Sequence, residues 1–288
     1  MSSDRHELDT LTLMAAATVA WALAIGSHQV AHGVAAAVSG ARIAMVTALG
    51  ITGRWTDLRT AGTLLTSVSG TVANILLMGC AWRAAHPREA PGLTAVLGWL
   101  VFTSSGWIAS GHLILSPLLG AGDWMSVADL FANRGPFRVS VFVTGLFVSG
   151  LLWKATHERL AYVVGGGSST QRVRVARRLT RIAGVVAAVL SATVGMVTGG
   201  WGPPDAPMQH AGVRFPVSLP GAVGIGGLTS LVLHALVALP LLRAPVMISQ
   251  RPVRGPLVSL PRSPGLIGMA LVMLGLLVLI LGPGLKVG

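Results

Sequence analysis

Long apolar runs separated by short polar segments dominate the chain. A helix needs roughly 20 apolar residues to cross the hydrocarbon core of a bilayer, which is about 30 Å thick. Seven runs approach this length, and each predicts a transmembrane helix: residues 11–37, 61–82, 93–115, 137–153, 182–199, 221–242 and 265–282. The pattern therefore predicts an all-α polytopic membrane protein with about six to seven transmembrane helices.

The composition agrees with a membrane protein. The 288 residues are 52% hydrophobic and only 10% charged, and the mean hydropathy is +0.72, well above the values of soluble domains. The leader MSSDRHELDT lacks the basic region and small-residue cleavage site of a signal peptide, so we expect the run 11–37 to be retained as a helix.

The formal net charge of +12 comes largely from two basic segments, residues 171–181 and 241–262. Both segments flank apolar runs, as the positively charged cytoplasmic loops of membrane proteins do. Such loops also attract anionic lipid headgroups. We therefore expect membrane lipids as partners and no nucleic acid.

Two further segments organise the chain. Residues 154–181 contain GGGSST followed by the basic run, and we interpret them as a basic linker between a core at 1–153 and C-terminal helices at 182–288. Residues 41–55, ARIAMVTALGITGRW, are β-branched and interrupted by glycine, which predicts a short hairpin dipping into the membrane. Irregular backbone at that depth needs protein or a wet cavity around it.

A pair of histidines stands in the first apolar run, within AIGSHQVAHGVAA at 24–36. His28 and His32 are four residues apart, so their imidazoles share one helix face and can converge on one ion. Cys80 is the only cysteine, so a metal site must use histidines and carboxylates. Asp123 is the acid that ends a long apolar run, in the Pro- and Gly-broken segment LILSPLLGAGDWMSV. An acid at membrane depth predicts a functional site, and Asp123 is our third ligand.

Three separated elements resemble the site-2 protease family of intramembrane zinc metalloproteases. HQVAH at 28–32 stands where that family carries HExxH, and GTVAN at 70–74 matches its Gly-x-x-x-Asn element. SPLLGAGDW at 116–124 matches the Pro- and Asp-containing third element through Pro117 and Asp123. The order is the same, each gap fits one loop and one span, and the resemblance covers about residues 11–135.

The resemblance implies a three-helix core in which His28, His32 and Asp123 hold Zn²⁺ while Asn74 helps to orient substrate. It also implies a general base at position 29, where this chain has Gln29. An amide does not accept a proton near neutral pH. We therefore expect a protein of a bacterial cell membrane that binds zinc and a transmembrane peptide or lipophilic substrate, with little or no peptide hydrolysis.

Several alternatives stay open. Gln29 is either an engineered replacement of Glu or the natural residue of a pseudoprotease. In a third alternative, a different chemistry is supported by another acid, such as Asp129 or Glu158, or by the zinc hydroxide itself. Rival functions are a membrane zinc enzyme acting on a small lipophilic substrate and a noncatalytic scaffold that binds transmembrane segments. Asp123 could instead be the N-cap of a following helix. We expect structural roles for the remaining candidates, His112, His210 and His234.

The predicted topology conflicts with the resemblance. The basic segments should be cytoplasmic, and counting back through four spans places the N-terminus in the cytoplasm and the loop 41–60 outside. Site-2 proteases generally place that loop and the zinc toward the cytoplasm. A broken or re-entrant helix within 116–153 would change the count by one and remove the conflict.

Overall fold

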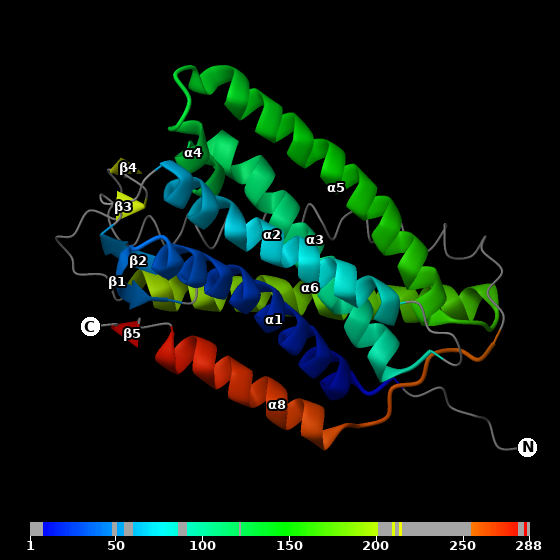
Figure 1. Ribbon diagram of the computed structural model, residues 1–288. Helices are drawn as coiled ribbons and strands as arrows, with labels where there is room; N and C mark the ends of the chain where they lie inside the picture. The colour runs from blue at the N-terminus through cyan, green and yellow to red at the C-terminus, as the bar shows by residue number, and fades with distance from the viewer. Residues whose placement is uncertain are drawn as a thin grey trace, which may run out of the picture.

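A bundle of long helices makes up most of the molecule (Figure 1). The computed structural model describes residues 8–47, 51–54, 60–85, 91–120, 122–200, 209–210, 213–214, 255–281 and 285–286. Its helices are α1 Thr10–Val38, α2 Thr60–Ala84, α3 Leu93–Leu119, α4 Asp123–Ala128, α5 Arg134–Val164, α6 Ser169–Gly200 and α8 Pro264–Gly275, which continues into the π-helical turn η1 Leu276–Ile280. The all-α membrane fold expected from the sequence is confirmed.

Four helices, α1, α2, α3 and α5, are long and apolar enough to cross a membrane. They correspond to the first four predicted spans. The run 182–199 forms the second part of α6, and the run 265–282 forms α8 and η1, a shorter apolar helix of 17 residues from Pro264 to Ile280. The sixth predicted span, 221–242, lies outside the described residues.

The strands are short and lie near one end of the bundle (Figure 1). β1 Arg42–Val46 pairs antiparallel with β2 Ile51–Arg54, and the register places Val46 opposite Ile51. The pairing confirms the hairpin predicted within 41–55, whereas its insertion into the membrane stays a prediction. β5 Leu285–Lys286 pairs with the other edge of β1, while β3 Gln209–His210 and β4 Val213–Arg214 form a separate pair.

The segment 154–181 is not the linker that its composition suggested. α5 continues to Val164 and α6 begins at Ser169, so only residues 165–168 connect the two helices. The arginines of the basic run lie within α6, and four of them are exposed and spaced as one helix face requires: Arg174, Arg177, Arg178 and Arg181. The buried positions between them pack on the core, so the segment is an amphipathic helix.

The helix break suspected within 116–153 does occur, between α3 and α5, but it does not change the number of crossings. Gly120 ends α3 in a left-handed conformation (φ 67°), and α4 adds only six residues before α5 begins. α3 and α5 therefore remain consecutive antiparallel helices (Figure 1). The conflict with the orientation of the resembled family persists.

Close contact between α3 and α5 fixes the helix end that carries α4. A Cβ atom on Gly145 of α5 would lie only 2.8 Å from Cγ1 of Ile114 and 2.9 Å from Cβ of Leu113, so the glycine allows the two helices to approach. One turn further along α3, Arg138 Nη2 donates to the carbonyl of Pro117 at 2.5 Å. These contacts hold the last turn of α3 in place.

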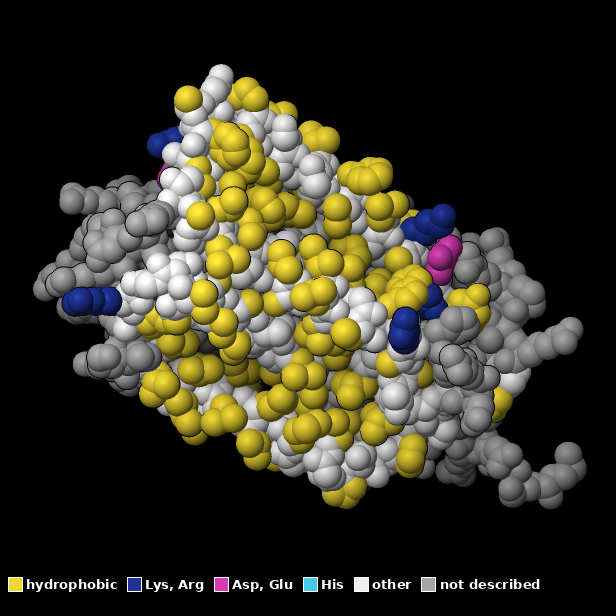
Figure 2. Space-filling view, viewed as in Figure 1, with side chains coloured by type: hydrophobic (Ala, Val, Ile, Leu, Met, Phe, Trp, Pro, Cys, Tyr) yellow, Lys and Arg dark blue, Asp and Glu magenta, His cyan; other side chains and the backbone are white. Residues whose placement is uncertain are grey.

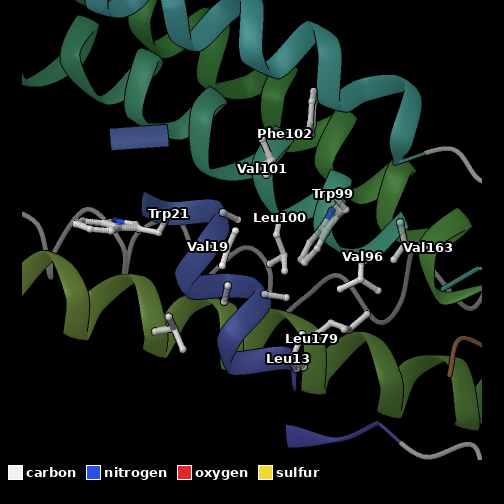
Figure 3. Packing of buried hydrophobic residues seen from close by; sticks show 14 of the residues in the cluster. Leu13, Val19, Trp21, Val96, Trp99, Leu100, Val101, Phe102, Val163 and Leu179 are labelled. Carbon is white, nitrogen blue, oxygen red and sulfur yellow. The ribbon is translucent and has the colours of Figure 1, made fainter. Parts of the chain in front are cut away.

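The apolar core lies where α1 meets α3, α5 and α6 (Figure 3). Leu13 of α1, Trp99 of α3 and Leu179 of α6 are almost completely buried there. The indole Nε1 of Trp99 donates to the carbonyl of Thr156 on α5 at 3.1 Å, which satisfies its polar atom inside the core. α1 is therefore held on several sides along the half that precedes its histidines.

The outer surface carries many exposed apolar side chains. They include Leu64, Leu65, Ile75 and Leu76 of α2 and Val139, Val143, Leu146 and Phe147 of α5. Figure 2 shows a broad hydrophobic area between the two ends of the molecule, with the charged side chains of this face near the ends. A soluble monomer rarely exposes so large an apolar area, whereas lipid covers it in a membrane.

One end of the bundle gathers segments that are far apart in sequence. Isolated β-bridges join Leu8 to Leu260 and Gly165 to Leu257, and the N–H of Asp9 donates to the carbonyl of Leu260 at 2.9 Å. The start of α1, the α5–α6 connection and the residues before α8 therefore lie at the same end. The turn from α3 through α4 to α5 lies at the opposite end (Figure 1).

Candidate metal centre

The predicted ligands His28, His32 and Asp123 come together between α1, α2 and α4. His28 and His32 face inward from α1 and are 1% and 8% exposed. One face of α2, which carries Thr66, Ser69, Gly70 and Asn74, packs against the two imidazoles. Asp123 reaches them from the start of α4. The sequence elements 28–32, 70–74 and 116–124 are thus adjacent in space.

The three donor atoms form a compact group. Nε2 of His28 and Nε2 of His32 are 3.0 Å apart, and they lie 3.3 Å and 3.2 Å from Oδ2 of Asp123. Two imidazole nitrogens and one carboxylate oxygen that converge in this way lie close enough to hold a metal ion. Ligand atoms about 2.0–2.2 Å from a tetrahedral Zn²⁺ have separations of this size.

His32 is oriented by the backbone of α2. Its Nδ1 lies 2.6 Å from the carbonyl oxygen of Thr66, which can only accept a hydrogen bond. Nδ1 therefore carries the proton, and in the neutral ring the lone pair is on Nε2, the atom that faces His28 and Asp123. Metal-ligating histidines typically donate their second ring N–H to a carbonyl or carboxylate in the same way.

His28 is oriented by Asn74, which is fully buried and whose Nδ2 lies 3.1 Å from Nδ1 of His28. Oδ1 of Asn74 is 3.3 Å from Oγ of Ser27, and that hydroxyl is 3.1 Å from the carbonyl oxygen of Ala24. A hydroxyl has one hydrogen and cannot donate to both the carbonyl and an amide oxygen.

We therefore exchange the nitrogen and the oxygen of the Asn74 amide, which turns Oδ1 toward His28 and leaves the heavy-atom positions unchanged. Its Nδ2 then donates to Ser27, and Ser27 donates to Ala24. Oδ1 accepts from Nδ1–H of His28. In this network the Nε2 lone pair of His28 is free, as it is in His32.

Gly70 leaves space for the donor nitrogens. A Cβ atom at this position would overlap Nε2 of His32 and would lie 2.7 Å from both Nε2 and Cε1 of His28. The glycine of the GTVAN element therefore allows α2 to approach the edges of both rings where their donor atoms converge. A larger residue would occupy this space.

Asp123 is the first residue of α4, and the N-cap position belongs to Gly122 (φ 92°). The alternative interpretation of Asp123 as an N-cap is therefore wrong, and its side chain points to the histidines instead. Burial by itself would raise the pKa of this carboxyl. The hydrogen bond from Nδ1 of His112 opposes that effect and lowers the pKa. A carboxylate that stays ionised suits a cation.

His112 also joins the cluster, a contact that the sequence interpretation missed. Its Nδ1 lies 3.3 Å from Oδ2 of Asp123, and its ring stacks on that of His28 with centroids 4.4 Å apart. The sequence feature that could have indicated this contact is the position of His112 two helical turns before the end of α3, the helix that precedes Asp123. His210 lies in β3 and its side chain is outside the described part, as is the whole of His234.

The two acids considered as replacement bases lie elsewhere. Asp129 ends α4, is exposed and pairs with Arg134 at 3.0 Å. Glu158 lies 24 residues beyond the start of α5 at Arg134, which is about 36 Å along the helix at 1.5 Å per residue. Gln29 is partly buried beside His28 on α1. Within the described ranges, Asp123 is thus the carboxylate that contacts the histidine pair.

The donor set fits a metal ion on three counts: free lone pairs on both Nε2 atoms, an ionised carboxylate and a space at Gly70 that a Cβ atom would fill. The chain contains four helices suited to a membrane and one His-His-Asp group suited to a metal among the described residues. Comparison with models of protein families, with curated proteins and with solved structures gives no match.

Proposed function

We propose that the protein is a zinc-binding membrane protein that resembles the site-2 protease family and in which peptide hydrolysis is disabled at position 29. The observation that carries this proposal is the convergence of Nε2 of His28, Nε2 of His32 and Oδ2 of Asp123 within 3.3 Å. Their ligand roles and the position of Gln29 follow the family pattern.

The donor chemistry favours zinc over other abundant cations. Two imidazoles and one carboxylate are a common ligand set for Zn²⁺, whereas Mg²⁺ and Ca²⁺ prefer oxygen ligands. Three protein ligands leave a fourth position of a tetrahedral site for water or substrate. When bound in such a site, zinc supplies Lewis-acid activation of that water or of a substrate carbonyl.

Hydrolysis also needs a group that accepts a proton, and the glutamate that does so in the resembled family is absent at position 29. Gln29 stands where the resembled family carries Glu, and its amide donates and accepts hydrogen bonds without taking up a proton. The described alternatives, Asp129 and Glu158, lie away from the histidines. A transmembrane peptide is the proposed ligand, and the chain as written should bind it with little or no cleavage.

Zinc content and a restored base test the proposal together. The detergent-purified chain should contain about one zinc per molecule by elemental analysis, whereas His28→Ala and Asp123→Ala should contain none while keeping their helical circular dichroism. Gln29→Glu should keep the zinc and cleave members of a panel of transmembrane peptides. Retention of zinc in both ligand variants contradicts the assigned site.

The rival functions give different results in the same experiment. A noncatalytic scaffold for transmembrane segments has no need of zinc, so a metal-free wild-type chain that still binds the peptides would favour it. A zinc enzyme for small lipophilic substrates would turn over such substrates with Gln29 in place. Zinc in the wild-type chain combined with cleavage only by Gln29→Glu favours the protease-like core.

A further inference from the structure

His112 lies beside two of the three metal-ligand candidates but belongs to none of the elements that suggested the site. Its Nδ1 is 3.3 Å from Oδ2 of Asp123. Its ring stacks on the ring of His28 with centroids 4.4 Å apart and planes inclined by 27°. α3 thereby touches one ligand on α4 through a nitrogen and another on α1 through a ring face.

The geometry separates His112 from the ligands themselves. Among the described residues, the group whose donor atoms all lie within 4.8 Å of one another consists of His28, His32 and Asp123. His112 is outside that group, and its side chain is 33% exposed, compared with 1% for the side chain of His28. A histidine that hydrogen-bonds a ligating carboxylate from outside is a common way to fix the orientation of that ligand.

Asp123 needs such support because its own helix supplies little. α4 has six residues, its N-cap Gly122 makes no side-chain cap hydrogen bond, and both Gly120 and Gly122 have positive φ. The carboxylate is thus carried by a short helix after a glycine turn, whereas His112 stands on a 27-residue helix packed against α1, α2 and α5. The position of His112 is therefore more firmly fixed by α3 than the position of Asp123 is by α4.

We propose that His112 is a positioning residue of the metal site. It donates Nδ1–H to the carboxylate of Asp123 and packs its ring against His28, so that both ligands keep the separation that a metal ion requires. This inference rests on the proposed function in one respect, namely that the cluster binds zinc. It adds a fourth residue whose effect on metal binding is exerted through Asp123 and His28.

Variants at position 112 separate the hydrogen bond from the ring contact. His112→Asn places an N–H close to the position of Nδ1, whereas His112→Phe keeps an aromatic ring and removes the donor. Zinc affinity, measured by competition with a chromophoric chelator, should fall about 10- to 100-fold in His112→Ala. We expect a similar fall in His112→Phe and a smaller one in His112→Asn.

Cobalt distinguishes a positioning residue from a ligand. At saturating Co²⁺, His112→Ala should show the visible bands of the wild-type site, because the ligand set is unchanged and only the affinity falls. Altered bands at saturation would make His112 a ligand and overturn the proposal. The matched control is His157→Ala, which should bind zinc like the wild type. His157 is a buried histidine on α5 whose Nδ1 contacts the carbonyl of Trp153.

The two proposals fail in different ways. A wild-type chain without zinc contradicts the proposed function and, with it, the role of His112. A wild-type chain that binds zinc and a His112→Phe variant that binds it equally well contradict the role of His112 alone. The role of His112 is also contradicted if His112→Asn binds zinc as weakly as His112→Ala. Thermal melts show which variants are folded, and only folded variants are compared.

Discussion

Gly70 of α2 lies directly against the ring of His28 of α1, so that a Cβ atom on the glycine would be 2.7 Å from Nε2 of the histidine. This contact links two sequence elements that are 42 residues apart. It also gives the glycine of GTVAN a physical role, since that position must stay free for the donor nitrogens. Because Gly70 has no Cβ atom, α2 can pack closely against α1 and the donor nitrogens keep the space that a metal ion needs.

Gly70→Ala should accordingly abolish stoichiometric zinc binding. The added methyl group competes with both donor nitrogens, and the overpacking should destabilise the fold by about 1–3 kcal/mol. Gly79→Ala, on the same helix with no atom within 4 Å of the added Cβ, is the control. It should bind zinc normally and be up to about 1 kcal/mol more stable. Equal zinc content in the two variants would show that Gly70 leaves no essential space.

Variants of Asn74 test the assigned orientation of its amide. If Oδ1 accepts from Nδ1–H of His28, then Asn74→Asp still provides an acceptor and should keep zinc binding. Asn74→Leu removes the acceptor and should weaken zinc binding about 10- to 100-fold. Chelator competition measures both affinities. Equal zinc affinity in Asn74→Leu and the wild type would contradict the assignment, because the acceptor for Nδ1–H of His28 would then be dispensable.

Much of this site was predictable because it follows local rules. The spacing of His28 and His32 places them on one helix face whatever the remaining structure is. Pro117 and the glycines that follow it predict the helix break before Asp123. His112 was not predictable in the same way. Its contact with Asp123 depends on how α4 folds back toward α3, a tertiary relationship with no periodic signature.

The fold shows the same division between local and tertiary signals. Apolar runs located the helices α1, α2, α3 and α5, because the requirement to cross a bilayer sets both length and composition. The prediction of a linker at 154–181 was wrong because it relied on glycine and charged residues, which usually indicate loops. In the structure Ser169 starts a helix whose arginines face outward while Leu179 and its buried neighbours pack on the core, so burial of one face outweighs the polar composition.

The N-terminus of α1 provides a stability prediction that depends on pH. The carboxylate of Asp9 accepts from the backbone N–H of Thr12 at 2.7 Å and from its hydroxyl at 2.8 Å. The backbone hydrogen bond is the main reason why the pKa of Asp9 is lowered from 3.8. A lowered pKa means that the stabilisation is fully present above 3.8 and is lost as the pH falls through the folded-state value.

Asp9→Ala should therefore melt at a lower temperature than the wild type at pH 6, and this difference should shrink as the pH falls below 3.8. Asp9→Asn keeps a capping oxygen without a titrating group, so its own difference from Asp9→Ala should not change with pH. Thermal melts of the three proteins in detergent measure the effect. A wild-type advantage that persists unchanged at pH 2.5 would contradict the capping role of the carboxylate.

The exposed arginines of α6 predict the orientation of the bundle. They lie at the end that also holds the start of α1 and the residues before α8, and the positive-inside rule places this end in the cytoplasm. The turn from α4 to α5 is at the other end, so Asp123 and the metal site should lie toward the noncytoplasmic side (Figure 1). The resembled family has the opposite arrangement.

Cysteine labelling decides between the two orientations. Cys80 is the only cysteine and is exposed, so the background is Cys80→Ser. Into it we would place Ala132→Cys, in the exposed α4–α5 turn, or Thr170→Cys, exposed at the start of α6. On intact cells an impermeant maleimide should label the first variant and should label the second only after permeabilisation. The reverse pattern would place the metal site toward the cytoplasm and would mean that the arginines of α6 do not determine the topology.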